Sequence, residues 1–122
     1  MRDLTGAARS PSHPERKYRR FKLRYPVHLL FRSGELISEV DAVSRDVSIG
    51  GLLVECSVPI PQHTAVDFVI SLRVRTLRPV ELMGEGRVVR VERSRTQAEF
   101  AVAIECKHPI SQIEAYLPAE AS

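Results

Sequence analysis

Short segments in which apolar and polar residues alternate are the feature that most constrains the fold of this chain. The clearest one runs from Val66 to Val74, where every second residue is apolar and Asp67, Ser71 and Arg73 stand between the apolar positions. A period of two residues places successive side chains on opposite faces of a β-strand. This segment therefore predicts a half-buried strand of an antiparallel sheet.

Five further segments have strand-like patterns and are bounded by turn residues such as Ser33-Gly34. Gly84 and Gly86 interrupt the longest of them and predict a bulge or a barrel corner there. Six short strands favour an all-β antiparallel barrel or sandwich, and closure into a barrel would also remove exposed edges. The predicted strands are Val27–Arg32, Leu36–Val47, Leu52–Cys56, Val66–Val74, Val80–Glu92 and Glu99–Cys106.

The chain of 122 residues is long enough for one domain with a modest core. We expect that domain to cover residues 15–117, with a flexible N-terminal lead at residues 1–14 and a tail at residues 118–122. Ser111-Gln112-Ile113-Glu114 fits a capping box and predicts a short C-terminal helix. Ile110, Ile113 and Leu117 could then share the face that packs on the strands.

The sequence favours a cytoplasmic protein that does not insert into a membrane. It contains no run of 18 apolar residues, and no apolar stretch follows Met1 as in a secretory signal. Cys56 and Cys106 are far apart and are expected to be reduced, buried thiols. The four histidines are scattered without metal-ligand spacing, so no metal site is predicted.

Positive charge is concentrated near the N-terminus. Residues 1–34 hold nine basic and two acidic residues, a net charge of +7, whereas residues 35–122 carry a net charge of −4. This asymmetry predicts an anionic partner that meets the N-terminal arm and not the whole surface.

The basic run Arg19–Arg24 contains two arginines, Arg20 and Arg24, whose spacing puts them on one side of the chain in either a helix or a strand. In an extended chain they would be about 13 Å apart. Guanidinium groups bind phosphate oxygens and the guanine edge in a bidentate manner and also stack on bases. On this run alone, a solvated basic tail explains the residues better.

A second motif, Asp46-x-Ser48-x-x-Gly51, combines a carboxylate, a hydroxyl and a glycine within six residues. A carboxylate can accept from the N1–H and N2–H₂ donors of guanine, and a hydroxyl and backbone N–H groups can bind oxygen acceptors. Asp, Ser and Gly are also the residues that turns prefer, so a plain turn is the alternative.

Together, Arg20-x-x-x-Arg24 followed by Asp46-x-Ser48-x-x-Gly51 resembles the signature of the PilZ domain family. The resemblance extends over roughly residues 15–117, and the residues between the two motifs leave room for one hairpin. It implies a six-stranded antiparallel β-barrel with a short C-terminal helix and a flexible N-terminal arm. The ligand it implies is cyclic di-GMP, bound on the outside of the barrel.

The resemblance also implies roles for individual residues. Arg20 and Arg24 would contact phosphate and guanine edges. A guanine would be surrounded by Asp46, Ser48 and Gly51. An arginine at the position of Arg19 accompanies, in the family, the binding of a mutually intercalated pair of ligands. Arg90 lies where some relatives place a side chain that stacks on a base. The predicted ligand-binding residues are therefore Arg19, Arg20, Arg24, Asp46, Ser48, Gly51 and Arg90.

The final predicted strand departs from the family pattern, since it holds Ala101, Ala103 and Cys106 where relatives often have glycine and a bulky apolar residue. We expect these differences to affect packing more than binding.

These features predict a sensor without enzymatic activity, catalytic residues, cofactor or metal. The arm Arg19–Arg24 would be mobile without ligand, close over bound cyclic di-GMP and change the contacts with a downstream effector protein.

Three alternatives remain open at this point. The +7 segment, interleaved with Tyr18, Phe21 and Tyr25, would suit a barrel that binds single-stranded nucleic acid, although the acidic barrel does not favour it and no nucleic acid is expected. An enzyme using Ser48 with Asp46 would need a nucleophile elbow and a base that the sequence does not show. A PilZ-fold adaptor would bind a partner protein but not the dinucleotide.

Overall fold

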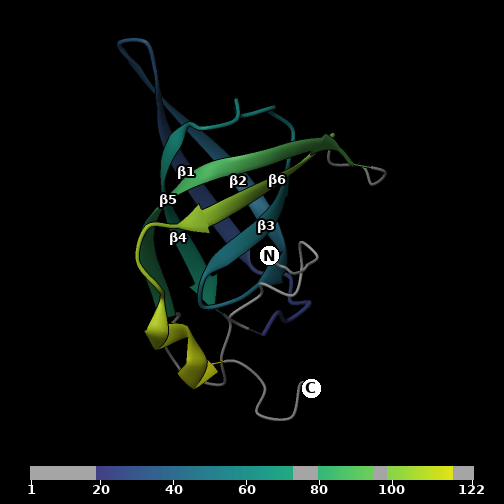
Figure 1. The fold of residues 1–122 in the computed structure, drawn as a ribbon, viewed down its shortest axis with the longest axis vertical. Helices are drawn as coiled ribbons and strands as arrows, with labels where there is room; N and C mark the ends of the chain where they lie inside the picture. Colours follow the sequence, from purple (N-terminus) through teal and green to yellow (C-terminus); the bar gives the residue numbers. More distant parts are fainter. Residues whose placement is uncertain (1–18, 73–79, 95–98, 117–122) are drawn as a thin grey trace, which may run out of the picture.

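The computed structural model describes residues 19–72, 80–94 and 99–116, which form a closed barrel of six antiparallel strands (Figure 1). This confirms the predicted all-β barrel. Five of the six predicted strands lie within one residue of the observed bounds at each end. The fourth begins within one residue of its predicted start, and its last two predicted residues lie outside the described ranges. The elements are β1 (Pro26–Ser33), β2 (Leu36–Val47), β3 (Gly51–Cys56), β4 (Ala65–Leu72), β5 (Val80–Arg93), β6 (Phe100–Cys106) and the 3₁₀ helix η1 (Ser111–Tyr116).

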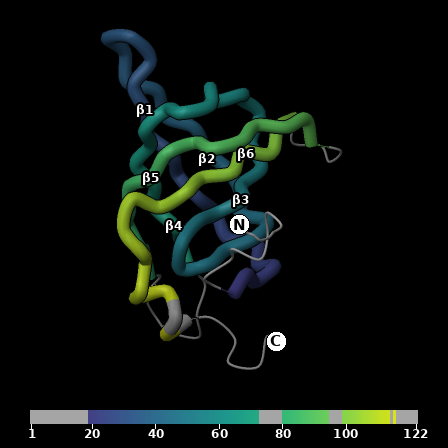
Figure 2. The backbone as a smooth tube through the Cα atoms, in the orientation of Figure 1, coloured from purple at the N-terminus to yellow at the C-terminus, as the bar shows by residue number. Residues whose placement is uncertain are grey.

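The strands follow the order β1-β2-β3-β6-β5-β4 around the barrel. The sheet closes because β1 pairs with both β2 and β4, with Val27 opposite Ile70 and Phe31 opposite Val66 in the closing ladder. The tube view shows the β1–β2 hairpin extending beyond one end of the barrel, while the start of the described chain lies at the other end (Figure 2). A closed sheet leaves no unpaired strand edge.

The barrel interior is filled by the apolar residues that alternate along the strands. In β4, the side chains of Val66, Phe68, Ile70 and Leu72 are buried, as the two-residue period predicts. Gly84 of β5 pairs with Phe68 and leaves room for its ring, because a Cβ at position 84 would lie 2.5 Å from the ring atom Cζ. A glycine opposite an aromatic residue is a recurrent solution in curved sheets.

Two register shifts interrupt the ladders, and neither falls at the glycines of β5. One lies in β2, where Arg45 is the extra residue between Ser44 and Asp46, and the other lies in β5 at Val89. The pairing of β5 with β4 is continuous through Gly84 and Gly86. Of the two predictions for these glycines, a bulge or a barrel corner, the bulge is wrong in position, because it lies at Val89, three residues after Gly86. The glycines themselves provide close packing.

The C-terminal segment closes one end of the barrel. The predicted C-terminal helix is present as the 3₁₀ helix η1, and the backbone N–H of Ile110 donates to the carbonyl of Ile49 at 2.8 Å. Ile110 and Ile113 are buried in the core, as expected. Leu117, the lead at residues 1–14 and the tail at residues 118–122 lie outside the described residues.

The described part of the chain contains no helix that is long and apolar enough to cross a membrane.

His28 lies on the outer face of β1 between two carboxylates of β2. Its Nδ1 is 2.8 Å from Asp41 Oδ1 and its Nε2 is 2.9 Å from Glu39 Oε1. Both nitrogens can donate only when the imidazole is protonated. The hydrogen bond with Asp41, and next that with Glu39, raise the pKa of His28 above its ordinary value of 6.5.

We predict that Asp41→Asn lowers the pKa of His28 more than Glu39→Gln does, because the bond with Asp41 has the larger effect. The pairing stabilises the folded state fully below the unfolded pKa and is lost as the pH rises through the raised, folded pKa. An NMR titration of the His28 ring protons measures this, with Glu81→Gln as the charge-matched control. A His28 pKa that is the same in Asp41→Asn and in the wild type would contradict the assignment.

Candidate functional site

The basic run is attached to the barrel at the end of β2. Phe21 and Val47 exchange two backbone hydrogen bonds, from Phe21 N to Val47 O at 2.9 Å and from Val47 N to Phe21 O at 2.8 Å. Arg20 and Lys22 are the sequence neighbours of Phe21, whereas Asp46 and Ser48 are those of Val47. This pairing brings together the two motifs, which are more than twenty residues apart in the chain.

Ser44 holds the next part of the arm. Its Oγ accepts from the Tyr25 N–H at 2.8 Å and donates to the Leu23 carbonyl, and its own N–H donates to the Tyr25 carbonyl at 2.8 Å. Ser44 is fully buried. The sequence does not mark it as part of the site, because a serine is a common residue within a strand. These bonds bring Arg24, which lies between Leu23 and Tyr25, close to β2 and β3.

Arg24 contacts a buried carboxylate. Its Nη1 lies 3.3 Å from Glu55 Oε1, and Arg45 Nη1 lies 3.9 Å from Glu55 Oε2. The side chain of Glu55 is 2% exposed, whereas those of Arg24 and Arg45 are 61% and 53% exposed. Ser94 Oγ approaches the second carboxylate oxygen at 3.5 Å. The site thus has one buried negative charge below two partly exposed guanidinium groups.

Ser48 organises the turn between β2 and β3. Its Oγ accepts from the N–H groups of Gly50 and Gly51 at 3.2 and 3.1 Å, and donates to the Gly51 carbonyl at 3.2 Å. Gly51 packs closely on β6, since a Cβ there would lie 2.6 Å from the Ile104 carbonyl oxygen. These residues therefore form the turn that their composition suggested, and these hydrogen bonds of the Ser48 hydroxyl lie within this turn.

Strand register places Asp46 and Arg90 on the same row of the outer face. Asp46 pairs with Leu53, Leu53 with Ala103, and Ala103 with Arg90. We call these four residues the outer strip. Three interstrand spacings separate its ends, roughly 14 Å from backbone to backbone. Leu53 and Ala103 form a small apolar floor between the carboxylate and the guanidinium.

The seven predicted residues thus fall into three groups on one outer region. Arg19, Arg20 and Arg24 belong to the arm and are exposed, with Arg24 the one held against Glu55. Ser48 and Gly51 form the turn beside them, and Asp46 begins the outer strip. Arg90 ends that strip, where its Nε is 3.1 Å from Glu92 Oε2.

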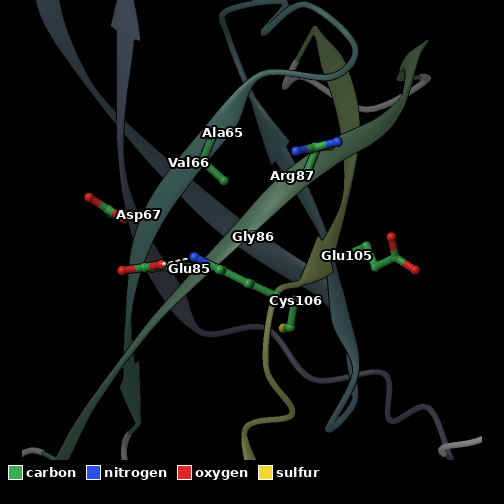
Figure 3. A pocket seen from close by; sticks show the side chains of 9 residues that line it. Ala65, Val66, Asp67, Glu85, Gly86, Arg87, Glu105 and Cys106 are labelled. Atoms are coloured by element: carbon green, nitrogen blue, oxygen red, sulfur yellow. Dashed lines mark ion pairs between the residues drawn. The ribbon is translucent and has the colours of Figure 1, made fainter.

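A hollow of about 530 Å³ lies elsewhere, along the outer face of β4, β5 and β6 (Figure 3). It is lined by none of the seven predicted residues. Figure 3 shows Asp67 and Glu85 on one side of it and Glu105 on the other, with an ion pair of 3.6 Å between the Lys107 ammonium and Glu85. The lining holds three carboxylates and only two cationic side chains, Arg87 and Lys107. This excess of negative charge does not favour an anionic ligand there.

Cys106 also lines this hollow, and it is not an activated thiol. Burial, and to a lesser extent the neighbouring Glu105 carboxylate, raises its pKa to about 11. The thiol is therefore protonated near neutral pH, whereas cysteine nucleophiles react as thiolates. Cys56 and Cys106 are both free cysteines, as expected, but only Cys56 is fully buried and Cys106 is partly buried. Within the described ranges, no group of three or more His, Cys, Asp or Glu side chains is placed to hold a metal ion.

The sequence did not single out Glu55, Arg45 or Ala103 as parts of the site. Alternation along Leu52–Cys56 places Glu55 on the outer face, which would normally mean exposure to solvent. The only available signal was a single carboxylate within an otherwise apolar strand. Its side chain contacts Arg24 of the arm, Arg45 and Ser94, and no local pattern predicts these contacts between distant segments.

Comparisons with known proteins point to one family. The model of the PilZ domain matches residues 14–117, which is most of the chain. No curated protein matches the chain.

Two solved structures share the fold. The Bacillus subtilis inhibitor of motility, MotI/DgrA, is similar with a TM-score of 0.66 at 17% identity, over 84% of this chain and 47% of that one. The chain thus spans about half the length of that protein. The PilZ domain of CeSA from a cellulose-synthesizing bacterium is similar with a TM-score of 0.52 at 24% identity, over 77% of this chain and 86% of that one. At such identities the likeness shows the fold alone.

We predict that Ser44→Ala loosens the arm without opening the barrel. The change leaves the Tyr25 N–H and the Leu23 carbonyl without their partner, at a cost of about 1–3 kcal/mol in the free energy of unfolding. Denaturant unfolding measures the loss, and amide hydrogen exchange should show faster exchange at Tyr25 than at Val66 in β4. Ser33→Ala, at an exposed position, is the control, and unchanged exchange at Tyr25 in Ser44→Ala would contradict the role of this hydroxyl.

Proposed function

The chain belongs to the PilZ domain family, and on this basis we propose that it binds cyclic di-GMP on the outer face of the barrel, beside the arm. The observation that carries the proposal is the pairing of Phe21 with Val47, which joins the arginine run to the Asp46–Gly51 segment. Neither motif has a specific meaning alone. Side by side, they offer guanidinium donors and a carboxylate acceptor to one ligand.

The two phosphodiesters and the guanine edges of the ligand would be bound by Arg20 and Arg24, since guanidinium groups form bidentate bonds with both. Asp46 would accept from the N1–H and N2–H₂ groups of a guanine, a pattern that other bases do not present in the same way. Ser48 and Gly51 would support this contact by shaping the turn, because their hydrogen-bonding groups are engaged within it.

A base could lie along the outer strip, over Leu53 and Ala103. The small alanine leaves room above β6, and Arg90 at the far end of the strip would stack on the exposed face of the base. Arg19 would contact a second ligand molecule, so that the dinucleotide binds as an intercalated pair. No further cofactor is required for this binding.

The arm would serve as the switch. Residues 19–24 would close over the bound dinucleotide and change the surface offered to a downstream protein partner. Ordering each residue costs roughly 1–2 kcal/mol. Phe21 and Tyr25 are already bonded to β2, so closure would mainly involve Arg19, Arg20 and the arginine side chains, which reduces that cost.

We predict that Arg20→Ala and Asp46→Ala each weaken binding of cyclic di-GMP roughly tenfold to a hundredfold, because hydrogen bonds to charged groups contribute about 1.5–3 kcal/mol each. Isothermal titration calorimetry measures both the affinity and the stoichiometry. We expect two ligands per chain in the wild type and fewer in Arg19→Ala.

Lys22→Ala is the matched control for this experiment, since it removes one positive charge from the same arm and should leave the affinity within about threefold. The nucleic-acid alternative would be supported if Lys22→Ala weakened binding as much as Arg20→Ala and if single-stranded oligonucleotides bound as tightly as the cyclic dinucleotide. A wild type that binds neither would support the adaptor that acts without ligand.

We predict that cyclic di-GMP slows hydrogen exchange at the backbone amides of Arg20, Lys22 and Arg24. Phe21 and Leu23 serve as internal controls, because their N–H groups already donate to Val47 and Phe21. Mass spectrometry or NMR measures the rates with and without ligand. If calorimetry shows binding and the rates across the arm stay the same, the arm does not close.

A further inference from the structure

Glu55 points outward from the barrel and yet is buried. Its neighbours Val54 and Cys56 point into the core, and its cross-strand partners, Val43 and Ala101, share the outer face with it. Among the outward residues around it, Val43 is exposed and Leu53 partly exposed, whereas Ala101 is buried and the Glu55 side chain is only 2% exposed. A carboxylate in such a place is costly unless positive charges and hydrogen-bond donors compensate it.

The groups that compensate this charge come from three parts of the chain. Arg24 Nη1 is 3.3 Å from Oε1, and Arg45 Nη1 and Ser94 Oγ lie 3.9 and 3.5 Å from Oε2. Arg24 has the shortest contact and belongs to the arm. The carboxylate therefore draws this arginine of the basic run onto the barrel wall.

A guanidinium group can serve two anions at once. It carries five N–H donors in a planar fork, and the contact with Glu55 uses Nη1 alone. With 61% of the Arg24 side chain exposed, the remaining donors are open to a ligand. An arginine that is already fixed loses less side-chain freedom when it binds, and this favours affinity.

We propose that Glu55 is a positioning residue for ligand binding, which holds the Arg24 guanidinium so that its free donors face the phosphate or guanine of the ligand. This inference rests on the proposed binding of cyclic di-GMP. Glu55 stays paired with Arg24 in the bound state and does not itself touch the ligand. Arg24 thus differs from Arg20, which is exposed and has to be ordered by the ligand.

A double-mutant cycle tests the coupling between the two residues. The affinity for cyclic di-GMP is measured by calorimetry in the wild type, in Glu55→Gln, in Arg24→Ala and in the double variant. Glu55→Gln keeps the shape of the side chain and removes its charge. We expect it to weaken binding about tenfold when Arg24 is present and to change it less than twofold, or to strengthen it, when Arg24 is absent.

The inference would be overturned, while the proposed function stands, if Glu55→Gln lowered the affinity equally with and without Arg24. It would also be overturned if Glu55→Gln caused no loss of affinity when Arg24 is present. A wild type that fails to bind would overturn both. Glu39→Gln, which removes an exposed carboxylate near the far end of β2, is the charge-matched control and should leave the affinity unchanged. Circular dichroism and thermal unfolding check that each variant is folded.

Arg24→Lys provides a second test that does not alter Glu55. Lysine keeps the positive charge beside the buried carboxylate, but its compact ammonium cannot offer a fork of donors to two anions. We expect a melting temperature close to that of the wild type and an affinity about tenfold lower. Full affinity in Arg24→Lys would show that a simple charge is enough and that positioning by Glu55 has no part in binding.

Discussion

The ladder between β1 and β4 is the constraint on which the rest of the structure depends. It closes the sheet, so that each strand has two hydrogen-bonded neighbours and each residue faces either the core or the surface. The interior is filled by alternate apolar side chains, with Phe68 packed over Gly84. Because the interior is occupied, a ligand would have to bind on the outer face, where strand register brings Asp46 and Arg90 into one row.

The N-terminal arm contributes positive charge to a barrel whose own residues are acidic on balance. Residues 35–122 carry a net negative charge, and the positive charge that the proposed anionic ligand requires is concentrated in the N-terminal run. Backbone bonds to Val47 and the Ser44 hydroxyl fix where that charge lies. The buried Glu55 carboxylate then fixes the direction of one guanidinium group. Position and direction of the charge are thus controlled by separate interactions.

Much of the fold could be predicted from the sequence, because alternation and turn residues are local signals. Leu36–Val47 was predicted with the observed bounds, and the core side of β4 follows from its two-residue period. The extra residues Arg45 and Val89 could not be placed, since a bulge depends on how two strands pair. The pairing of the motifs was recognised by resemblance, whereas the burial of Glu55 depends on a contact between distant segments that no periodicity encodes.

The two bulges also limit how such a surface can change during evolution. Each lies immediately before a residue of the outer strip, Arg45 before Asp46 and Val89 before Arg90. Deleting either extra residue would turn the strand beyond it by half a period and exchange its inner and outer side chains. Residues along the outer strip can therefore change by substitution without altering the fold. A deletion at either bulge would disrupt the barrel, so selection would remove it.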